Sequence, residues 1–174
     1  MVNHVPYDLI QKIEKLEIRK YPEVIFAVVE NDMYDSGFNL LFQYISGENK
    51  TQSKISMTAP VVTSEKIKMT VPVVTRNNYM AFVVPSTYSK NTVPVPTNTS
   101  VKIEVQSKKI MAVLRFGGRT HEKRVQNYIQ ELITILKTHK IQSNGEPILM
   151  RYNSPFTPGF LRRNEVAVEI IKRE

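Results

Sequence analysis

The alternation of apolar and polar residues predicts short strands interrupted by two helical segments. Residues 13–21 alternate in the order IEKLEIRKY, and the β-branched run 24–29 follows Pro22, so we expect two adjacent strands here. Large apolar and aromatic residues then recur at positions 34, 38, 41, 42 and 45, which is helical spacing. Asp35 or Ser36 can cap this segment and Gly47 can end it. The pattern predicts a short amphipathic helix.

A ten-residue segment follows and is repeated. KISMTAPVVT occupies residues 54–63 and KIKMTVPVVT occupies residues 66–75, with eight of ten positions identical. Both copies are rich in β-branched residues and contain a proline, so the simplest structure is a hairpin that turns near residues 64–65, with the prolines at bulges or edges. Residues 79–84 form a further expected strand. Residues 85–99, rich in Pro, Thr, Ser and Asn, are expected to be a loop.

The first pattern then returns in the remainder of the chain. We expect strands at 101–105, 110–116, 147–152 and 166–171, and a longer helix whose apolar stripe runs from Val125 to Leu136 with a cap near Thr120. The whole chain therefore reads as two ββαββ halves, about 10–84 and 100–172, within one domain over 1–174. This predicts an α+β fold with two helices on a distorted, mostly antiparallel sheet or open barrel and a pseudo-two-fold repeat. A ligand cleft between the halves is expected.

Composition narrows the classes of function. The chain has 174 residues with 41% hydrophobic side chains, enough for one core, and it has no cysteine, which excludes disulfides, thiolate catalysis and Cys-based metal centres. No apolar run is long enough to span a membrane, and we expect a cytoplasmic protein. The net charge of +8 comes from scattered basic residues. We therefore expect a solvated basic surface, a monomer, and no nucleic-acid or membrane partner. An anionic small ligand would suit such a basic surface.

Several stretches of the chain match motifs of one known protein family, and they occur in the order in which that family has them. They are IRKYP at 18–22, GF at 37–38, LFQYISGEN at 41–49, KISMTAPV at 54–61, FGG at 116–118, RYNSPFTP at 151–158 and FLRRNEV at 160–166. Together they resemble the SOUL/haem-binding family over roughly residues 10–172. The resemblance implies a distorted barrel with two helices, related to the effector-binding domains of bacterial transcription regulators. It also implies a haem or porphyrin bound non-covalently on an apolar surface beside the first helix.

The candidate cofactor-binding residues follow from this implied ligand. Haem needs an axial ligand or an apolar platform with cations for its propionates. The candidates are Phe38, Phe42, Met57, Met69, Arg115, Tyr152 and Phe156. Met57 and Met69 occupy equivalent places in the repeat and could approach iron or fill the core. Phe38 and Phe42 could line the platform or face inward, and Tyr152 and Phe156 could close the pocket or anchor the proline-containing loop.

Other polar residues allow more than one interpretation. The resemblance implies basic side chains on the first helix, yet residues 34–47 contain no lysine or arginine, so Lys54 and Arg115 are considered as substitutes. His4, His121 and His139 are expected to be surface histidines. In the segment Arg162-Arg163-Asn164-Glu165, we expect an arginine–carboxylate network that fixes the last strand, with ligand binding as the alternative.

Three functions are compared. The first is non-catalytic binding of haem or a related tetrapyrrole for buffering, transport or sensing. The second is an effector-binding module for another apolar or cationic small molecule. The third is a hydrolase; no nucleophile elbow, zinc-protease motif, P-loop or dinucleotide fingerprint is present in the sequence. A carboxylate with a raised pKa in the cleft would favour the hydrolase.

Overall fold

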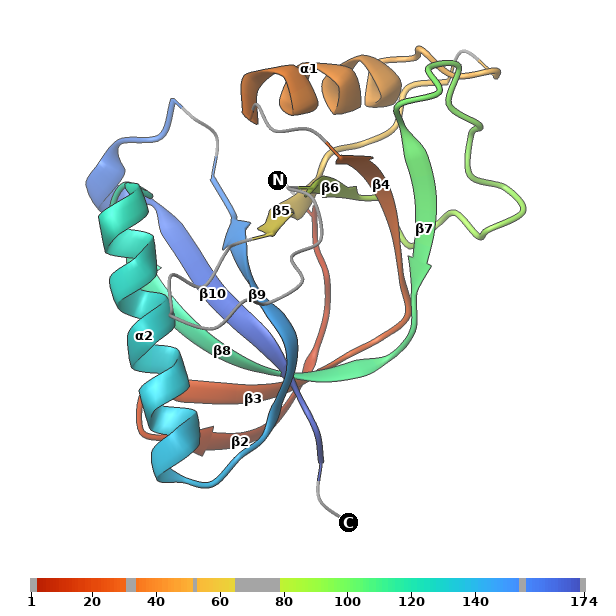
Figure 1. Ribbon diagram of the computed structural model, residues 1–174. Coiled ribbons are helices and arrows are strands. Elements are labelled where there is room, and N and C mark those ends of the chain that lie inside the picture. Colours follow the sequence, from red (N-terminus) through yellow and green to blue (C-terminus); the bar gives the residue numbers. More distant parts are fainter. Residues whose placement is uncertain (1–2, 31–33, 52, 65–78, 154–155, 173–174) are drawn as a thin grey trace. The chain divides into compact units, whose positions relative to one another are not determined.

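The computed structural model describes residues 3–30, 34–51, 53–64, 79–153 and 156–172 (Figure 1). These residues form two compact units. Unit 1 takes the described parts of residues 1–5, 23–63 and 75–108, and unit 2 takes those of residues 6–22, 64–74 and 109–174.

Unit 1 is a small antiparallel sheet with one helix packed against it. Its elements are β1 (Asn3–His4), β4 (Val24–Glu30), α1 (Tyr34–Ile45), β5 (Thr58–Ser64), β6 (Tyr79–Val83) and β7 (Lys102–Gln106). The strands pair in the order β5-β6-β4-β7, and β1 runs parallel to β5. Helix α1 buries Leu41 and Tyr44 in a core that includes Val29 and Phe82 of the sheet. This packing holds the remaining faces of α1 toward solvent.

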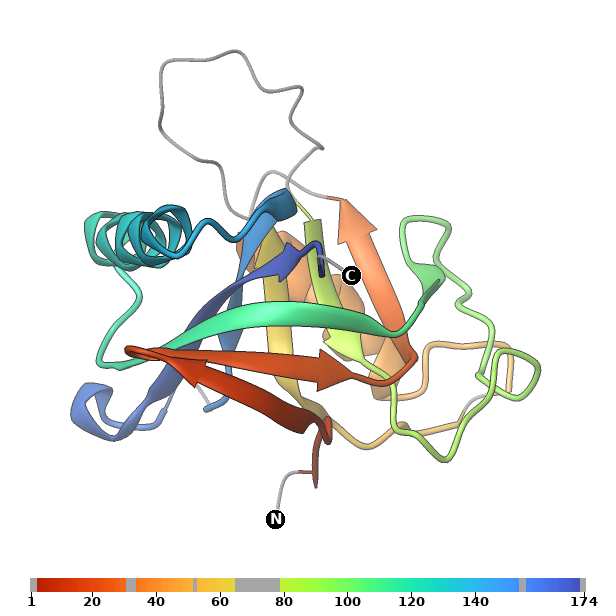
Figure 2. The ribbon, with the colours of Figure 1, turned by 90° about the horizontal axis from the view of Figure 1, so that it is seen from below.

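Unit 2 has the same plan with a longer helix. Its elements are β2 (Asp8–Ile13), β3 (Leu16–Tyr21), β8 (Lys109–Gly117), α2 (Glu122–Thr138), β9 (Ser143–Arg151), the 3₁₀ helix η1 (Gly159–Leu161) and β10 (Arg163–Ile170). The antiparallel order is β2-β3-β8-β10-β9, and Figure 2 shows the β2–β3 hairpin beside β8. Helix α2 buries one stripe, from Val125 to Leu136, on a core that contains Leu114 and Val166.

Each unit includes strands from the other sequence half: unit 2 takes β2 and β3 from the first half, and unit 1 takes β7 from the second. Strand β3 precedes β4 in the chain but pairs with β8, and β7 precedes β8 but pairs with β4. The remaining order in the two units is equivalent, with β4-α1-β5-β6 matching β8-α2-β9-β10. Consequently, neither unit coincides with one of the ββαββ halves read from the sequence.

The predicted fold class is confirmed: the described residues give two α-helices and sheets whose strand pairs are antiparallel except for β1 with β5. Helix α1 and helix α2 lie where the apolar spacing places them. Pro60 lies at an irregularity, because the β5–β6 register shifts between Thr58 and Val61. The second copy of the repeat, residues 66–75, lies outside the described residues.

Two details differ from the sequence expectations. The alternating stretch 13–21 and the run 24–29 are not adjacent strands, because β3 lies between β2 and β8 while β4 lies between β6 and β7. Which strands pair depends on contacts distant in sequence, and alternation carries no information about them. The N-cap of α2 is His121, next to Thr120 as expected, but the His121 side chain makes no capping hydrogen bond.

Candidate functional site

Two aromatic candidates meet on α1. The Phe38 and Phe42 rings are one helical turn apart and stack with centroids 6.2 Å apart and planes inclined by 12°. Phe38 also meets the Phe82 ring edge-on at 5.3 Å and is half-buried against the unit 1 core. Phe42 remains 51% exposed. Phe38 therefore packs against the hydrophobic core of unit 1, while the Phe42 ring forms an exposed apolar surface.

A shallow hollow of about 570 Å³ lies beside Phe42. Its lining residues are Phe42, Gln43, Ser46, Gly47, Glu48, Asn49 and Thr97. Buried Asn49 fixes one wall because its Nδ2 donates to the carbonyls of Tyr44 and Ser53 at 3.1 and 2.7 Å. Six of the seven lining residues are glycine or polar, and the one charged residue, Glu48, is acidic. The hollow therefore offers no cation to a propionate.

Three further candidates occupy different environments. Met57 is half-buried and packs on the unit 1 core, which fits a filling role. Arg115 is exposed on β8, and Phe156 is 95% exposed in the segment before η1. Met69 lies outside the described residues. Lys54, considered as a substitute cation, is exposed.

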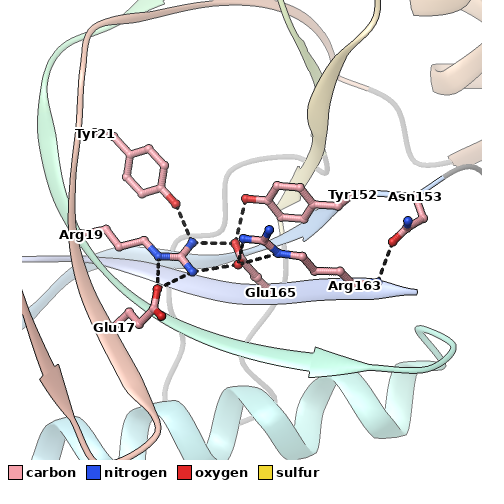
Figure 3. A network of polar contacts seen from close by, with 7 residues as sticks. All are labelled: Glu17, Arg19, Tyr21, Tyr152, Asn153, Arg163 and Glu165. Atoms are coloured by element: carbon pink, nitrogen blue, oxygen red, sulfur yellow. Dashed lines mark hydrogen bonds and ion pairs between the residues drawn. The ribbon is translucent and has the colours of Figure 1, made fainter. Parts of the chain in front are cut away.

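Tyr152 belongs to a buried polar network in unit 2 (Figure 3). Its hydroxyl donates to Glu165 Oε2 at 2.8 Å. The same carboxylate accepts two hydrogen bonds of 2.9 Å from the Arg19 guanidinium and one of 2.7 Å from Arg163 Nη2. Glu165 is completely buried and the Arg19 side chain is 2% exposed. The expected network within residues 162–165 is confirmed for Arg163 and Glu165.

Arg19 is the member of the network that sequence reasoning missed. Its guanidinium lies 4.1 Å from the centre of the Tyr7 ring, donates to the Tyr21 hydroxyl at 3.0 Å, and bonds Glu17 Oε2 at 2.7 Å. The available signal was an arginine inside the alternating strand 13–21. Its partner, however, is 146 residues away along the chain.

Electrostatics indicate a structural role for this carboxylate. Burial alone would raise the pKa of Glu165, but the hydrogen bond and charge of Arg19, together with bonds from Arg163 and Tyr152, hold that pKa below its usual value. Burial, followed by the nearby Glu165 charge, raises the pKa of the Tyr152 hydroxyl. A general acid needs a raised carboxyl pKa. Glu165 therefore does not support the hydrolase reading.

A second pocket in unit 2 has a different lining. It encloses about 380 Å³ between the β2–β3 hairpin, β8, the end of β10 and the segment after α2. Its lining residues are Ile10, Gln11, Ile13, Ile18, Ile110, His139, Lys140, Ile141, Gln142, Ile170, Ile171 and Lys172. Ile18 belongs to the α2 core, and four further isoleucines, at 13, 110, 141 and 170, pack against that core. We call this the isoleucine pocket.

The end of α2 places basic side chains at the isoleucine pocket. His139 is the C-cap of the helix, and its Nε2 lies 3.9 Å from Glu14 Oε2. Lys140 adopts a left-handed backbone with φ of 55°, and the Ile141 amide closes the helix end by donating to the Leu136 carbonyl at 2.9 Å. The pocket thus combines an apolar lining with an imidazole and the two exposed lysines, Lys140 and Lys172.

Comparison with known sequences decides the family. The profile described as "SOUL heme-binding protein" matches residues 2–169. The chain belongs to the SOUL haem-binding family. Among curated SOUL relatives, "Heme-binding protein 2" of Homo sapiens is 30% identical over 91% of this chain and 78% of its own length. The Mus musculus protein of the same name is 29% identical over 97% of this chain and 84% of its own length.

Solved structures show the same fold at low sequence identity. The SOUL chain matches the C-terminal domain of EcmrR with a TM-score of 0.65 and 13% identity, over 96% of this chain and 99% of that one. It matches a hydrolase from Listeria innocua with a TM-score of 0.63 and 11% identity, over 92% and 94%. These likenesses concern the fold alone. Among the described residues, no helix is both long and apolar enough to cross a membrane.

Proposed function

We propose that this protein binds haem, or a tetrapyrrole of similar size and charge, without transforming it, and that the isoleucine pocket holds the ligand. The observation that carries the proposal is the composition of that pocket: an isoleucine lining with His139, Lys140 and Lys172 around it. Membership of the SOUL family supports the choice of ligand.

The residues of the pocket match the three chemical features of haem. Isoleucine side chains would contact the apolar macrocycle, the His139 imidazole would supply an iron ligand, and the two lysines would pair with the propionates. A volume of about 380 Å³ is within the range of small-molecule sites. When bound, the haem iron would supply a strong, ligand-sensitive absorbance.

The surface around Phe42 is the alternative location for the same ligand. Phe42 offers an exposed ring stacked on Phe38, which suits a flat ligand. The adjacent hollow, however, carries Glu48 and no basic residue among its lining residues. The isoleucine pocket is the better match for a dianionic ligand because it supplies lysines and a histidine together.

The experiment is a haemin titration of the purified protein followed by Soret absorbance. We expect saturable one-to-one binding with a Kd at or below roughly micromolar, about 8 kcal/mol of binding. His139→Ala should shift the Soret band and weaken binding about tenfold or more, equivalent to about 1.4 kcal/mol. His121→Ala, at the other end of α2, is the matched control and should leave the spectrum unchanged.

Two further variants separate the location from the function. Lys140→Gln combined with Lys172→Gln should weaken haemin binding a few-fold, since each exposed ion pair contributes about 1 kcal/mol at most, while Lys137→Gln should not. Saturable binding that responds to Phe42→Ala but not to His139→Ala would place the ligand on α1 and refute the pocket assignment. Weak, unsaturable binding by the unaltered protein would refute haem binding itself.

A further inference from the structure

Three large apolar side chains project into solvent within six residues of unit 2. Phe156 is 95% exposed, Phe160 is 84% exposed and Leu161 is 61% exposed. Single exposed apolar residues are ordinary, but a group on one short segment marks an interaction surface. We call residues 156–161 the aromatic loop.

The aromatic loop is held by its own hydrogen bonds. Arg162 Nε donates to the Thr157 carbonyl at 2.8 Å, and the Leu161 amide donates to the Pro158 carbonyl at 2.9 Å. The backbone of Gly159 lies against the Arg119 side chain, because a Cβ built there would meet Arg119 Cγ at 3.1 Å. The apolar side chains are therefore presented by an ordered backbone and gain little burial from the fold.

Two segments beside the aromatic loop carry basic residues and no acidic ones. Residues 109–121 and 152–164 contain no aspartate or glutamate. The pairing of β8 with β10 brings these two segments together, with Arg163 opposite Gly117. Arg115 and Arg119 are exposed on the first segment, and Arg162 is half-buried on the second. The fold thus gathers cations that are scattered along the sequence.

We propose that the aromatic loop is a docking surface for an anionic lipid bilayer. The phenylalanines and Leu161 insert at the boundary between headgroups and acyl chains, and the surrounding arginines bind lipid phosphates. Basic residues close to an anionic membrane surface are attracted to its lipid headgroups. Exposed apolar side chains flanked by cations match the layering of a bilayer surface, in which an apolar interior lies below a charged plane.

This inference is independent of haem binding and goes beyond the partners expected from sequence. Along the sequence the basic residues are dispersed, and only the folded chain brings Arg115, Arg119 and Arg162 to neighbouring strands and loops. Docking on a surface needs no spanning helix, so the finding on helix length does not conflict with it.

The test is co-sedimentation with phosphatidylcholine vesicles prepared with and without phosphatidylserine. We expect association with the phosphatidylserine vesicles that weakens as salt is raised, because Arg–phosphate attraction is screened. Phe156→Ser combined with Phe160→Ser should reduce the association at least tenfold. Arg115→Gln combined with Arg119→Gln should abolish the preference for phosphatidylserine.

Matched controls keep the result specific. Val95→Ser changes an apolar residue of unit 1 that is 51% exposed, and Lys12→Gln removes an exposed charge from β2; neither should alter sedimentation. Unchanged thermal unfolding of the Phe156/Phe160 variant would show that the fold is intact. Equal binding to both vesicle types, or association that survives the double phenylalanine change, would overturn the proposal. A single-stranded oligonucleotide bound through these phenylalanines in place of vesicles would also overturn it.

Discussion

The guanidinium of Arg19 and the carboxylate of Glu165 form a bidentate ion pair, with Nη1–Oε2 and Nη2–Oε1 distances of 2.9 Å each. The pair joins β3 to β10, two strands that flank β8 on either side. Neither side chain reaches solvent to a meaningful extent. The interior of unit 2 therefore depends on charge compensation as well as on apolar packing.

Removing one partner of this pair should be strongly destabilising. Glu165→Gln leaves Arg19 and Arg163 without their shared anion, and we expect the free energy of unfolding to fall by about 3–5 kcal/mol. Arg19→Met should cost less, since Arg163 still neutralises the carboxylate. Urea unfolding of both variants and of the double variant measures the coupling. Lys15→Gln, which breaks the exposed pair with Glu131, should cause no measurable change. A loss below about 1 kcal/mol in Glu165→Gln would contradict the buried-pair account.

Acid should destabilise the protein partly through Glu165. The pKa of this carboxyl is below its ordinary value of 4.5 when folded, so the unfolded chain binds its proton first as the pH falls. The stability that depends on the ionised carboxylate is present above pH 4.5 and is lost as the pH drops through the folded pKa. Chemical unfolding at a series of acidic pH values measures this loss. The free energy of unfolding should depend less on pH in Glu165→Gln than in the unaltered protein. Identical pH slopes in the two proteins would contradict a contribution from Glu165.

Alkali should destabilise unit 1 through Tyr44. Burial raises the pKa of this phenol to about 12, and its hydroxyl donates to the Pro94 carbonyl at 2.6 Å. Between pH 10 and about 12 the folded protein keeps a proton that the unfolded chain loses, so stability falls as the pH rises. One such group contributes a slope of about 1.4 kcal/mol per pH unit. Tyr44→Phe should remove that part of the slope, as measured by unfolding at alkaline pH.

Two glycines with left-handed backbones provide a matched pair. Gly118 has φ of +93° and Gly145 has φ of +81°, so alanine at either position should cost about 1–2 kcal/mol through backbone strain. A Cβ at Gly145 meets nothing within 4 Å, whereas at Gly118 it lies 3.2 Å from Arg124 Nη2, which donates to the Gly117 carbonyl at 2.8 Å. Gly118→Ala should therefore be the more damaging in thermal unfolding. If Gly145→Ala were the more damaging of the two, the Arg124 side chain would move aside from the new Cβ without a loss of stability.

The helices were predictable because their determinants are local. The stripe from Val125 to Leu136 repeats at the helical period, and the same residues form the buried face of α2. Strand β2 was missed in most of its length because its residues are almost all exposed and show no alternation. Its pairing with β3 depends instead on a tight turn in which Glu14 has φ of 54°.

The site was less predictable because its residues come from distant segments. The lining of the isoleucine pocket comes from positions 10, 11, 13, 18, 110, 139–142 and 170–172. These segments are far apart along the chain and become neighbours only in the folded structure. Phe38 and Phe42 were recognisable as neighbours from their helical spacing. Phe156 was expected either to close a pocket or to anchor its loop, but it is 95% exposed, a property that residue type alone does not reveal.

The placement of β3 with β8 and of β7 with β4 has a consequence for folding. The order of synthesis is not the order of sheet assembly: β3 can pair with β2 at once, but its second partner, β8, exists only after the chain has been extended by some ninety residues. Long-range pairing of this kind slows folding, since loop closure precedes any gain from the contacts. A chain cut between its two ββαββ halves would separate β3 from β8 and β7 from β4, so we expect recovery of a native fold only when the two fragments are mixed.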